Sequence, residues 1–316
     1  MMPAHVNIIR QLEDLPSSLR GGAVSIGNFD GVHRGHLRLC ERLTAASKRV
    51  GGPAIAFTFD PHPAAILRPD EIPAPLTWLE RKATLLGELG VDAVIAYPTH
   101  AALLQLSADE FFQQILVDQL GAAVIVEGPN FCFGRNREGT IQKLQELATA
   151  RELQVEVVPP LEDDGHYVSS SRVRAALAEG DVAHAADLLT RWHRLRGLAA
   201  RGAGRGAQLG FPTANLAELD SVAPAPGVYA GRGYCSAGAY AAAIHVGPIP
   251  TFDDPAARVE VHLIGHTGDL YGERVEVDFY AHVRDIRAFA SPEELKQQLH
   301  NDVSAAAEIA AQRSSP

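Results

Sequence analysis

Two histidines, His33 and His36, lie three residues apart in the segment GNFDGVHRGH, which runs from residue 27 to residue 36. The segment follows a β-rich run and precedes a helical pattern, so we expect a loop that opens a helix. The start of a helix offers backbone N–H groups and the positive end of its dipole to an anion. Gly35 leaves room for a phosphate near the backbone, and two imidazoles can stabilise charge on a phosphate in transfer. The pattern predicts a phosphate-transfer site, in preference to an incidental surface pair or a zinc pair.

A second group of polar residues lies in the other half of the chain. Gly202, Gly206 and Gly210 precede Thr213 and Asn215 in a segment that ends FPTANL. Glycine-rich loops can hold phosphates through backbone amides. Such loops are common, and a turn followed by a strand is the alternative interpretation.

Glu260 and His262 lie in the segment RVEVHLIGH, whose alternation predicts a strand. Side chains two positions apart on a strand point to the same face. A carboxylate placed there can orient an alcohol and take its proton during phosphoryl transfer. The alternative is a glutamate that is solvated on the surface of the strand.

The first half of the chain alternates β-rich runs with helical patterns. Strands are predicted within residues 21–29, 53–61, 91–98, 122–128 and 155–161, and helices within 36–50, 78–90, 107–121 and 141–154. Ser107 and Glu110 have the spacing of a capping box that starts the third helix. This alternation predicts a parallel sheet with crossover helices.

The pattern changes after about residue 185, where proline and glycine become dense. Short predicted strands at 227–235, 239–247, 258–266 and 273–283 indicate a small antiparallel barrel. The segment 291–312 predicts a closing helix with Ser291 as N-cap, Pro292 in the first position and Glu294 completing a capping box. The expected fold class is therefore α/β followed by β, with the boundary between residues 184 and 195.

Composition excludes several classes of protein. The 316 residues are 46% hydrophobic and 21% charged, which is globular composition, and the net charge of −10 disfavours a nucleic-acid binder. Cys40, Cys132 and Cys235 are far apart, which disfavours disulfides and zinc–thiolate sites and fits a reducing cytosol. The first residues lack a secretory pattern, and no apolar run is long enough for a membrane span. We expect a cytoplasmic protein without nucleic-acid or membrane partners, and a weak homo-oligomer is left open.

The histidine segment resembles the H-x-G-H motif of nucleotidylyltransferases, in the form found in bacterial bifunctional riboflavin kinase/FAD synthetases. Further segments match that family in order: TFDPHP at 58–63, EGPNFCFG at 127–134, SSSRVR at 169–174 and PTAN at 212–215. The resemblance implies a Rossmann-like FMN adenylyltransferase domain at 1–186 and a barrel-shaped riboflavin kinase domain at 187–316. It implies riboflavin, FMN, FAD and ATP as small-molecule substrates and products, with Mg²⁺ in both steps.

The resemblance also implies roles for individual residues. His33 and His36 would be catalytic in the adenylyl transfer, and Glu260 would take the proton from the ribityl hydroxyl in the kinase step. His62 and Asn130 would bind FMN, with Mg²⁺ an alternative partner for Asn130. ATP and its phosphates in the transferase would contact a larger set: Gly27, Asn28, Phe29, Asp30, Gly35, Ser170, Ser171 and Arg174. Asp30 has an alternative interpretation as a turn residue. In the kinase, ATP and Mg²⁺ would contact Gly202, Gly206, Gly210, Thr213 and Asn215, the last two as Mg²⁺ ligands.

The second half departs from the family at four positions. Ala207 stands where arginine is usual, His245 and Ile249 stand in a segment that is normally more polar, and Ile286 replaces a glutamate. We expect a working kinase with altered substrate affinity. The alternatives are an FMN adenylyltransferase with an inactive kinase domain, an adenylyltransferase for another nucleotide, and a non-catalytic flavin-binding protein.

Overall fold

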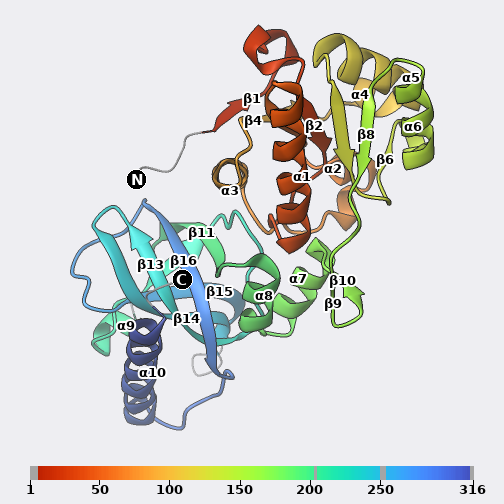
Figure 1. Cartoon of the computed structure of the whole chain (residues 1–316). Coiled ribbons are helices and arrows are strands. Elements are labelled where there is room, and N and C mark those ends of the chain that lie inside the picture. Colours follow the sequence, from red (N-terminus) through yellow and green to blue (C-terminus); the bar gives the residue numbers. More distant parts are fainter. Residues whose placement is uncertain (1–5, 203–204, 250–253, 314–316) are drawn as a thin grey trace. The chain divides into compact units, whose positions relative to one another are not determined.

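The computed structural model describes residues 6–202, 205–249 and 254–313, and the chain forms two compact units (Figure 1). The first unit comprises Met1–Pro73 and Trp78–Ser169, and the second comprises Ala74–Thr77 and Ser170–Pro316. None of the helices in the described part of the chain combines the length and the apolar character needed to cross a membrane.

The first unit is built on a parallel sheet, as the sequence predicts, and the sheet has six strands in the order β1-β4-β3-β2-β5-β8. Its strands are β1 (Asn7–Ile9), β2 (Ala23–Ile26), β3 (Ala54–Asp60), β4 (Ala93–Pro98), β5 (Val124–Glu127) and β8 (Gln154–Val157). The central strands are apolar and buried because helices cover both faces of the sheet. The edge strand β1 was not expected, since three residues give too short a pattern.

Helices pack on both faces of this sheet. On one face, α1 (Arg34–Val50) and α3 (Leu79–Glu88) contribute Cys40, Leu43 and Leu86 to a core with β2–β5. The other face is covered by α5 (Ala108–Phe111), its π-helical continuation η4 (Phe112–Gln119) and α6 (Ile141–Thr149). Ser107 and Glu110 form the predicted capping box.

Shorter elements complete the first unit. They are η1 (Leu12–Asp14), η2 (Ser17–Leu19), α2 (Ala64–Leu67), η3 (Pro69–Glu71), α4 (Ala101–Gln105), η5 (Arg135–Arg137) and the hairpins β6 (Cys132–Phe133) with β7 (Gly139–Thr140) and β9 (Glu162–Asp163) with β10 (His166–Tyr167). Such two-residue strands carry no periodicity that a sequence could reveal.

The second unit contains the predicted antiparallel barrel, which is closed in the order β11-β12-β15-β14-β13-β16. Its strands are β11 (His193–Ala200), β12 (Ala214–Ala217), β13 (Gly227–Cys235), β14 (Gly238–Ile249), β15 (Asp254–Leu263) and β16 (Arg274–Arg284). Strict alternation of burial along β11 shows one face turned to the barrel core and one turned outward. The unit also holds α7 (Ser170–Ala178), α8 (Val182–Leu189) and the short α9 (Arg205–Gln208).

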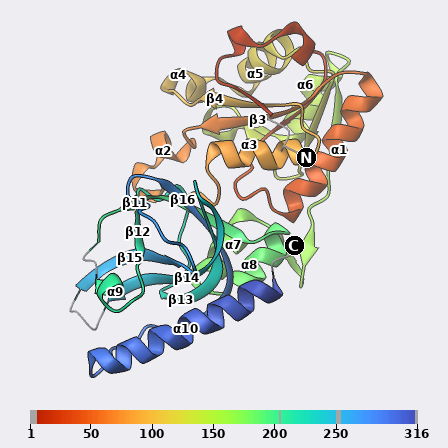
Figure 2. The same ribbon diagram turned by 90° about the vertical axis from the view of Figure 1, so that its left-hand side faces the viewer.

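The closing helix α10 (Pro292–Gln312) lies along the outside of the barrel beside β13 and β14 (Figure 2). Ser291 caps it as predicted, because its hydroxyl accepts from the backbone of Glu294 at 3.2 Å. The Glu294 carboxylate accepts from Ala290 N at 3.0 Å. The predicted capping box therefore reaches one residue further back than its usual form.

Candidate active sites

The histidine loop leaves the carboxyl end of β2 and enters α1. His33 is the residue before α1, in extended conformation, and is 6% exposed. Its ring stacks on that of His36 with centroids 3.8 Å apart and planes inclined by 19°. A Cβ atom on Gly35 would lie 3.1 Å from the His33 ring, so the glycine permits this stacking. Two imidazolium rings at this distance would repel each other, and a bound phosphate would relieve that repulsion.

The loop itself is tightly wound. Phe29 and Val32 have φ of 47° and 41°, and Gly31 between them has φ of 83°. Residues other than glycine rarely adopt a positive φ, and such backbone conformations often cluster in functional loops. Phe29 is 1% exposed and its ring centroid lies 5.4 Å from that of His36. Phe29 therefore packs against the ring of His36.

A hydrogen bond joins this loop to the segment after β3. Asn28 Nδ2 lies 2.8 Å from His62 Nε2, and Ala64 N donates to His62 Nδ1 at 3.1 Å. A neutral imidazole that accepts at Nδ1 carries its proton on Nε2. Turning the Asn28 amide then places its oxygen against that proton and its NH₂ group away from the ring. Residues predicted to bind ATP and FMN thus position each other.

The sequence analysis gave no role to two further polar residues of the first unit. Glu127 is buried at the end of β5, and burial raises the pKa of its carboxyl well above the usual range. Lys82 lies on α3, where burial lowers its pKa and the charges of Asp30 and Asp60 act in the opposite direction. The one available signal for Glu127 was a charged residue at the end of an apolar strand. Asn130, three residues later, is exposed.

Ser170, Ser171 and Arg174 belong to α7 and hence to the second unit. Arg174 Nε donates to the carbonyl of Ala74 at 2.8 Å, within the same unit. The serines occupy the first two positions of the helix.

The predicted kinase residues form a row on the outer face of the barrel. Asn215 on β12 lies directly opposite Glu260 on β15, and His245 on β14 lies opposite Glu260 from the other side. Thr213 Oγ1 donates to Glu260 Oε2 at 3.3 Å. The neighbours Val259 and Val261 are buried in the barrel, so Glu260 and His262 share the outer face as predicted. The barrel thus brings Thr213, Asn215 and Glu260 together from segments 45 residues apart.

The glycine-rich segment lies against this row. A Cβ atom on Gly202 would lie 2.1 Å from Asn215 Nδ2, and one on Gly206 would lie 2.5 Å from the Phe211 carbonyl oxygen. Gly210 has φ of 93°, which favours glycine. His262 Nδ1 lies 2.8 Å from the Pro212 carbonyl and holds the segment in place. Gly204 lies outside the described residues.

Oxygen donors dominate this row, which suits Mg²⁺. Asn215 Oδ1 is buried and has no hydrogen-bond partner among the described residues, and the Thr213 hydroxyl and Glu260 carboxylate lie beside it. Hard oxygen ligands are those that Mg²⁺ prefers. The residues present therefore fit this ion.

The departures from the family pattern lie around the same row. His245 Nε2 lies 3.0 Å from the Pro248 carbonyl, and a Cβ on Gly247 would meet Ile286 Cδ1 at 2.7 Å. Ala207 is exposed on α9. The side chain of Ile249 lies outside the described part of the structure.

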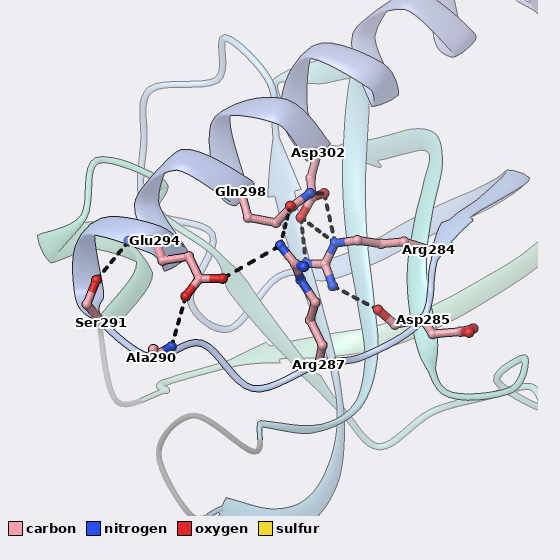
Figure 3. Close-up of polar contacts among 8 residues, drawn as sticks. All are labelled: Arg284, Asp285, Arg287, Ala290, Ser291, Glu294, Gln298 and Asp302. Atoms are coloured by element: carbon pink, nitrogen blue, oxygen red, sulfur yellow. Dashed lines mark hydrogen bonds and ion pairs between the residues drawn. The ribbon is translucent and has the colours of Figure 1, made fainter.

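The segment between β16 and α10 is tied to the helix by a polar network (Figure 3). Arg284 Nη2 donates to Asp302 Oδ2 at 2.7 Å, and the Asp302 side chain is 4% exposed. Gln298 donates to the same carboxylate at 2.8 Å and accepts from Arg287 Nη2 at 2.8 Å. The network fixes the path of the segment that carries Ile286.

A separate cavity of about 560 Å³ lies in the second unit, between the α7–α8 turn and the ends of β13 and β16. Asp181, Tyr229, His282 and Asp285 line it, and burial raises the pKa of Tyr229 to about 12. The kinase row does not line it, so we assign it no part in that chemistry.

The parallel sheet with stacked histidines at a helix start defines a nucleotidyltransferase unit, and the barrel with its oxygen-rich row defines a small kinase unit. The FAD synthetase family model matches residues 15–172, and the riboflavin kinase model matches residues 189–310. The chain belongs to the family of bifunctional riboflavin kinase/FMN adenylyltransferases.

Curated relatives support this membership over nearly the full length. The bifunctional riboflavin kinase/FMN adenylyltransferase of Pseudomonas fluorescens is 38% identical, and the alignment covers 97% of this chain and 98% of the relative. The Escherichia coli K12 protein of the same name is 33% identical, with 94% and 96% covered. A Streptococcus pneumoniae crystal structure, described as a macrolide-efflux protein, shares the fold with a TM-score of 0.84 and 30% identity over 96% of this chain and 98% of that one.

Proposed function

We propose that this chain phosphorylates riboflavin with ATP to give FMN and then transfers AMP from a second ATP to FMN, giving FAD and pyrophosphate. The observation that carries the proposal is the match of both family models to one chain, each covering one set of predicted site residues. It favours two working activities over a transferase with an inactive kinase. The proposed boundary between residues 186 and 187 falls in the interval between the two matches.

In the kinase step, Glu260 takes the proton of the ribityl 5′-hydroxyl while that oxygen attacks the γ-phosphorus of ATP and ADP leaves. The hydrogen bond from Thr213 at 3.3 Å orients the carboxylate. Thr213 and Asn215 would hold Mg²⁺, which neutralises phosphate charge when bound. Gly202 lets the nucleotide segment lie close to Asn215, and Gly206 lets it lie close to the Phe211 carbonyl.

In the transferase step, a phosphate oxygen of FMN attacks the α-phosphorus of ATP, and the bond to the β-phosphate breaks. We propose that His33 and His36 stabilise the charge on the α-phosphate, and that Ser170, Ser171 and Arg174 hold the leaving pyrophosphate. An arginine fork suits phosphate oxygens. His62 and Asn130 are proposed to orient FMN. Catalysis here is positioning and charge stabilisation, with no covalent enzyme intermediate.

Flavin products separated by chromatography test the proposal. The purified chain with ATP and Mg²⁺ should convert riboflavin to FMN and FAD, and FMN to FAD. Glu260→Gln should slow FMN formation by about 10²–10⁴-fold, the usual contribution of a general base, and leave FAD formation from FMN intact. The variant His33→Ala/His36→Ala should show the opposite loss.

Each outcome decides between the candidate functions. FAD from FMN without any FMN from riboflavin would favour the transferase with an inactive kinase. Turnover of neither flavin would contradict the proposal. The cytosolic location, the absence of nucleic-acid and membrane partners, and a weak homo-oligomer stay predictions.

A further inference from the structure

Glu127 is a buried carboxyl group that none of the roles above uses. It is the last residue of β5 and is 3% exposed. It directly precedes Gly128 and the segment that reaches Asn130, for which FMN binding is proposed. A carboxyl group is rarely buried so deeply without a partner that compensates for lost water.

The partner is a backbone N–H at the start of the histidine loop. Ile26 N donates to Glu127 Oε1 at 2.5 Å, and Ile26 is the last residue of β2 before Gly27. The backbone ladder between β2 and β5 pairs Ala23 with Val124 and Val24 with Ile125. Beyond Val24 and Ile125, the Glu127 side chain takes the place of a backbone acceptor.

The backbone of Glu127 is engaged on its other side. Its carbonyl accepts from Val158 N at 2.8 Å, beyond β8. The residue therefore bridges in both directions: its main chain reaches the β8 side and its side chain reaches β2. One side chain thus ties the starts of two loops that leave the same edge of the sheet.

The bridge between Glu127 and Ile26 lies at the point of the sheet where the strand order reverses. From β2 the chain continues outward to β3 and β4, and then crosses to β5 and β8 on the opposite side. In open parallel sheets, ligands bind outside the carboxyl ends of the strands where the strand order reverses in this way. The reversal lies between β2 and β5, which are the strands that Glu127 joins.

The surroundings of the Glu127 carboxyl group favour its neutral, protonated form. The N–H of Ile26 is its one hydrogen-bond partner within the described ranges, and no cation contributes to its titration. Burial without a cation favours the protonated form, and its pKa is accordingly raised well above the usual range. A neutral bridge adds no negative charge beside a site proposed to receive two phosphorylated substrates.

We propose that Glu127 is a positioning residue for adenylyl transfer, whose carboxyl group bridges β2 and β5 and so sets the spacing of the loops that receive ATP and FMN. The inference rests on the proposed transferase activity. Glu127 touches no substrate in this proposal, and it acts through the backbone that starts the histidine loop.

Two substitutions at Glu127 distinguish the need for a hydrogen-bond acceptor from the need for a negative charge. Glu127→Gln keeps an oxygen acceptor for Ile26 N and is neutral, whereas Glu127→Leu has similar bulk and no acceptor. We expect Glu127→Leu to lower kcat for FAD formation from FMN by about 10–100-fold, because small misplacements of reacting groups cost rates of this order. Glu127→Gln should stay within about threefold of the unchanged chain, which is the rescue that distinguishes a positioning hydrogen bond from bulk alone.

Matched controls lie in the same chain. Glu156→Leu removes a carboxylate from the adjacent strand β8, where it forms a surface ion pair with Arg49, and should leave FAD formation unchanged. Riboflavin phosphorylation should be unchanged in all variants and reports that the second unit is folded. If Glu127→Leu does not fold, Glu127→Met, an unbranched side chain of similar length, replaces it with the same expectation.

Two results would overturn the proposal. Glu127→Leu or Glu127→Met with unchanged kcat would mean that the bridge does not matter for the reaction. Glu127→Gln as impaired as Glu127→Leu would mean that an ionised carboxylate is needed, which contradicts a neutral bridge. Failure of the unmodified chain to form FAD is a different outcome, because it rejects the proposed transferase before any variant is compared.

Discussion

The histidine pair illustrates how much a single residue can decide. Gly35 brings His33 and His36 to a centroid distance of 3.8 Å, because a larger residue would crowd the His33 ring. The residue types and their spacing led to the proposal that the pair forms a site. Its stacking depends on the start of α1, which fixes the direction of both side chains.

Cysteine reactivity gives a test at the scale of single residues. Cys40 is fully buried on α1, and burial raises the pKa of its thiol to about 12. The thiolate is the reactive form, so Cys40 should stay unmodified at pH 8 while Cys132 and Cys235, which are partly exposed, react. Titration with a chromogenic disulfide reagent should give two fast thiols and a third only after denaturation. Three fast thiols in the folded chain would contradict the burial of Cys40.

At the scale of elements, α10 holds the segment that follows β16 in place through polar contacts. The Arg284–Asp302 pair joins the end of the strand to the middle of the helix, with both side chains largely buried. Removing one partner of such a pair leaves an uncompensated charge, which is costly.

We therefore expect Asp302→Ala to lower the free energy of unfolding of the second unit by about 3–5 kcal/mol. Urea unfolding, followed through riboflavin phosphorylation and near-ultraviolet circular dichroism, measures the loss. Glu294→Ala is the comparison on the same helix: it removes an exposed carboxylate that lies 4.0 Å from Arg287 and accepts from Ala290 N, contacts that together contribute about 1–2 kcal/mol. Equal losses in the two variants would show that burial of the pair has no special role.

At the scale of the whole molecule, two units combine different architectures in one chain. The parallel sheet places its loops at the carboxyl edge of the strands, whereas the barrel places its row on an outer face. Substitutions in the histidine loop and in the barrel row are therefore expected to abolish the transferase and the kinase activity separately.

The stability of the chain should depend on pH through Glu127. Its pKa is raised in the folded chain above the usual 4.5, so the folded state binds a proton that the unfolded state has released. The stabilisation is complete below about pH 4.5 and is lost as pH rises toward the folded pKa, at up to about 1.4 kcal/mol per pH unit. The glutamine in Glu127→Gln cannot titrate. The free energy of unfolding of this variant should therefore rise relative to that of the unmodified chain as the pH increases from about 5 to about 8. Urea unfolding at several pH values measures the difference, and a difference independent of pH would contradict it.

The sequence by itself determined the alternation of strands and helices in the first unit and the barrel with its closing helix, whereas the residues of both sites stay predictions. These features depend on local periodicity, capping residues and motif spacing, which any stretch of sequence displays directly. The two-residue hairpins and β1 carry too few residues for such a pattern.

Only the tertiary structure decided which distant residues meet. Register across three strands aligned Asn215, Glu260 and His245, and the reversal of strand order placed Glu127 beside Ile26. A carboxylate on a strand has the same local appearance whether it is solvated, catalytic or a bridge between strands. Its burial and its partner depend on chain segments about a hundred residues away in sequence for Glu127, and long-range pairing of that kind leaves no local trace.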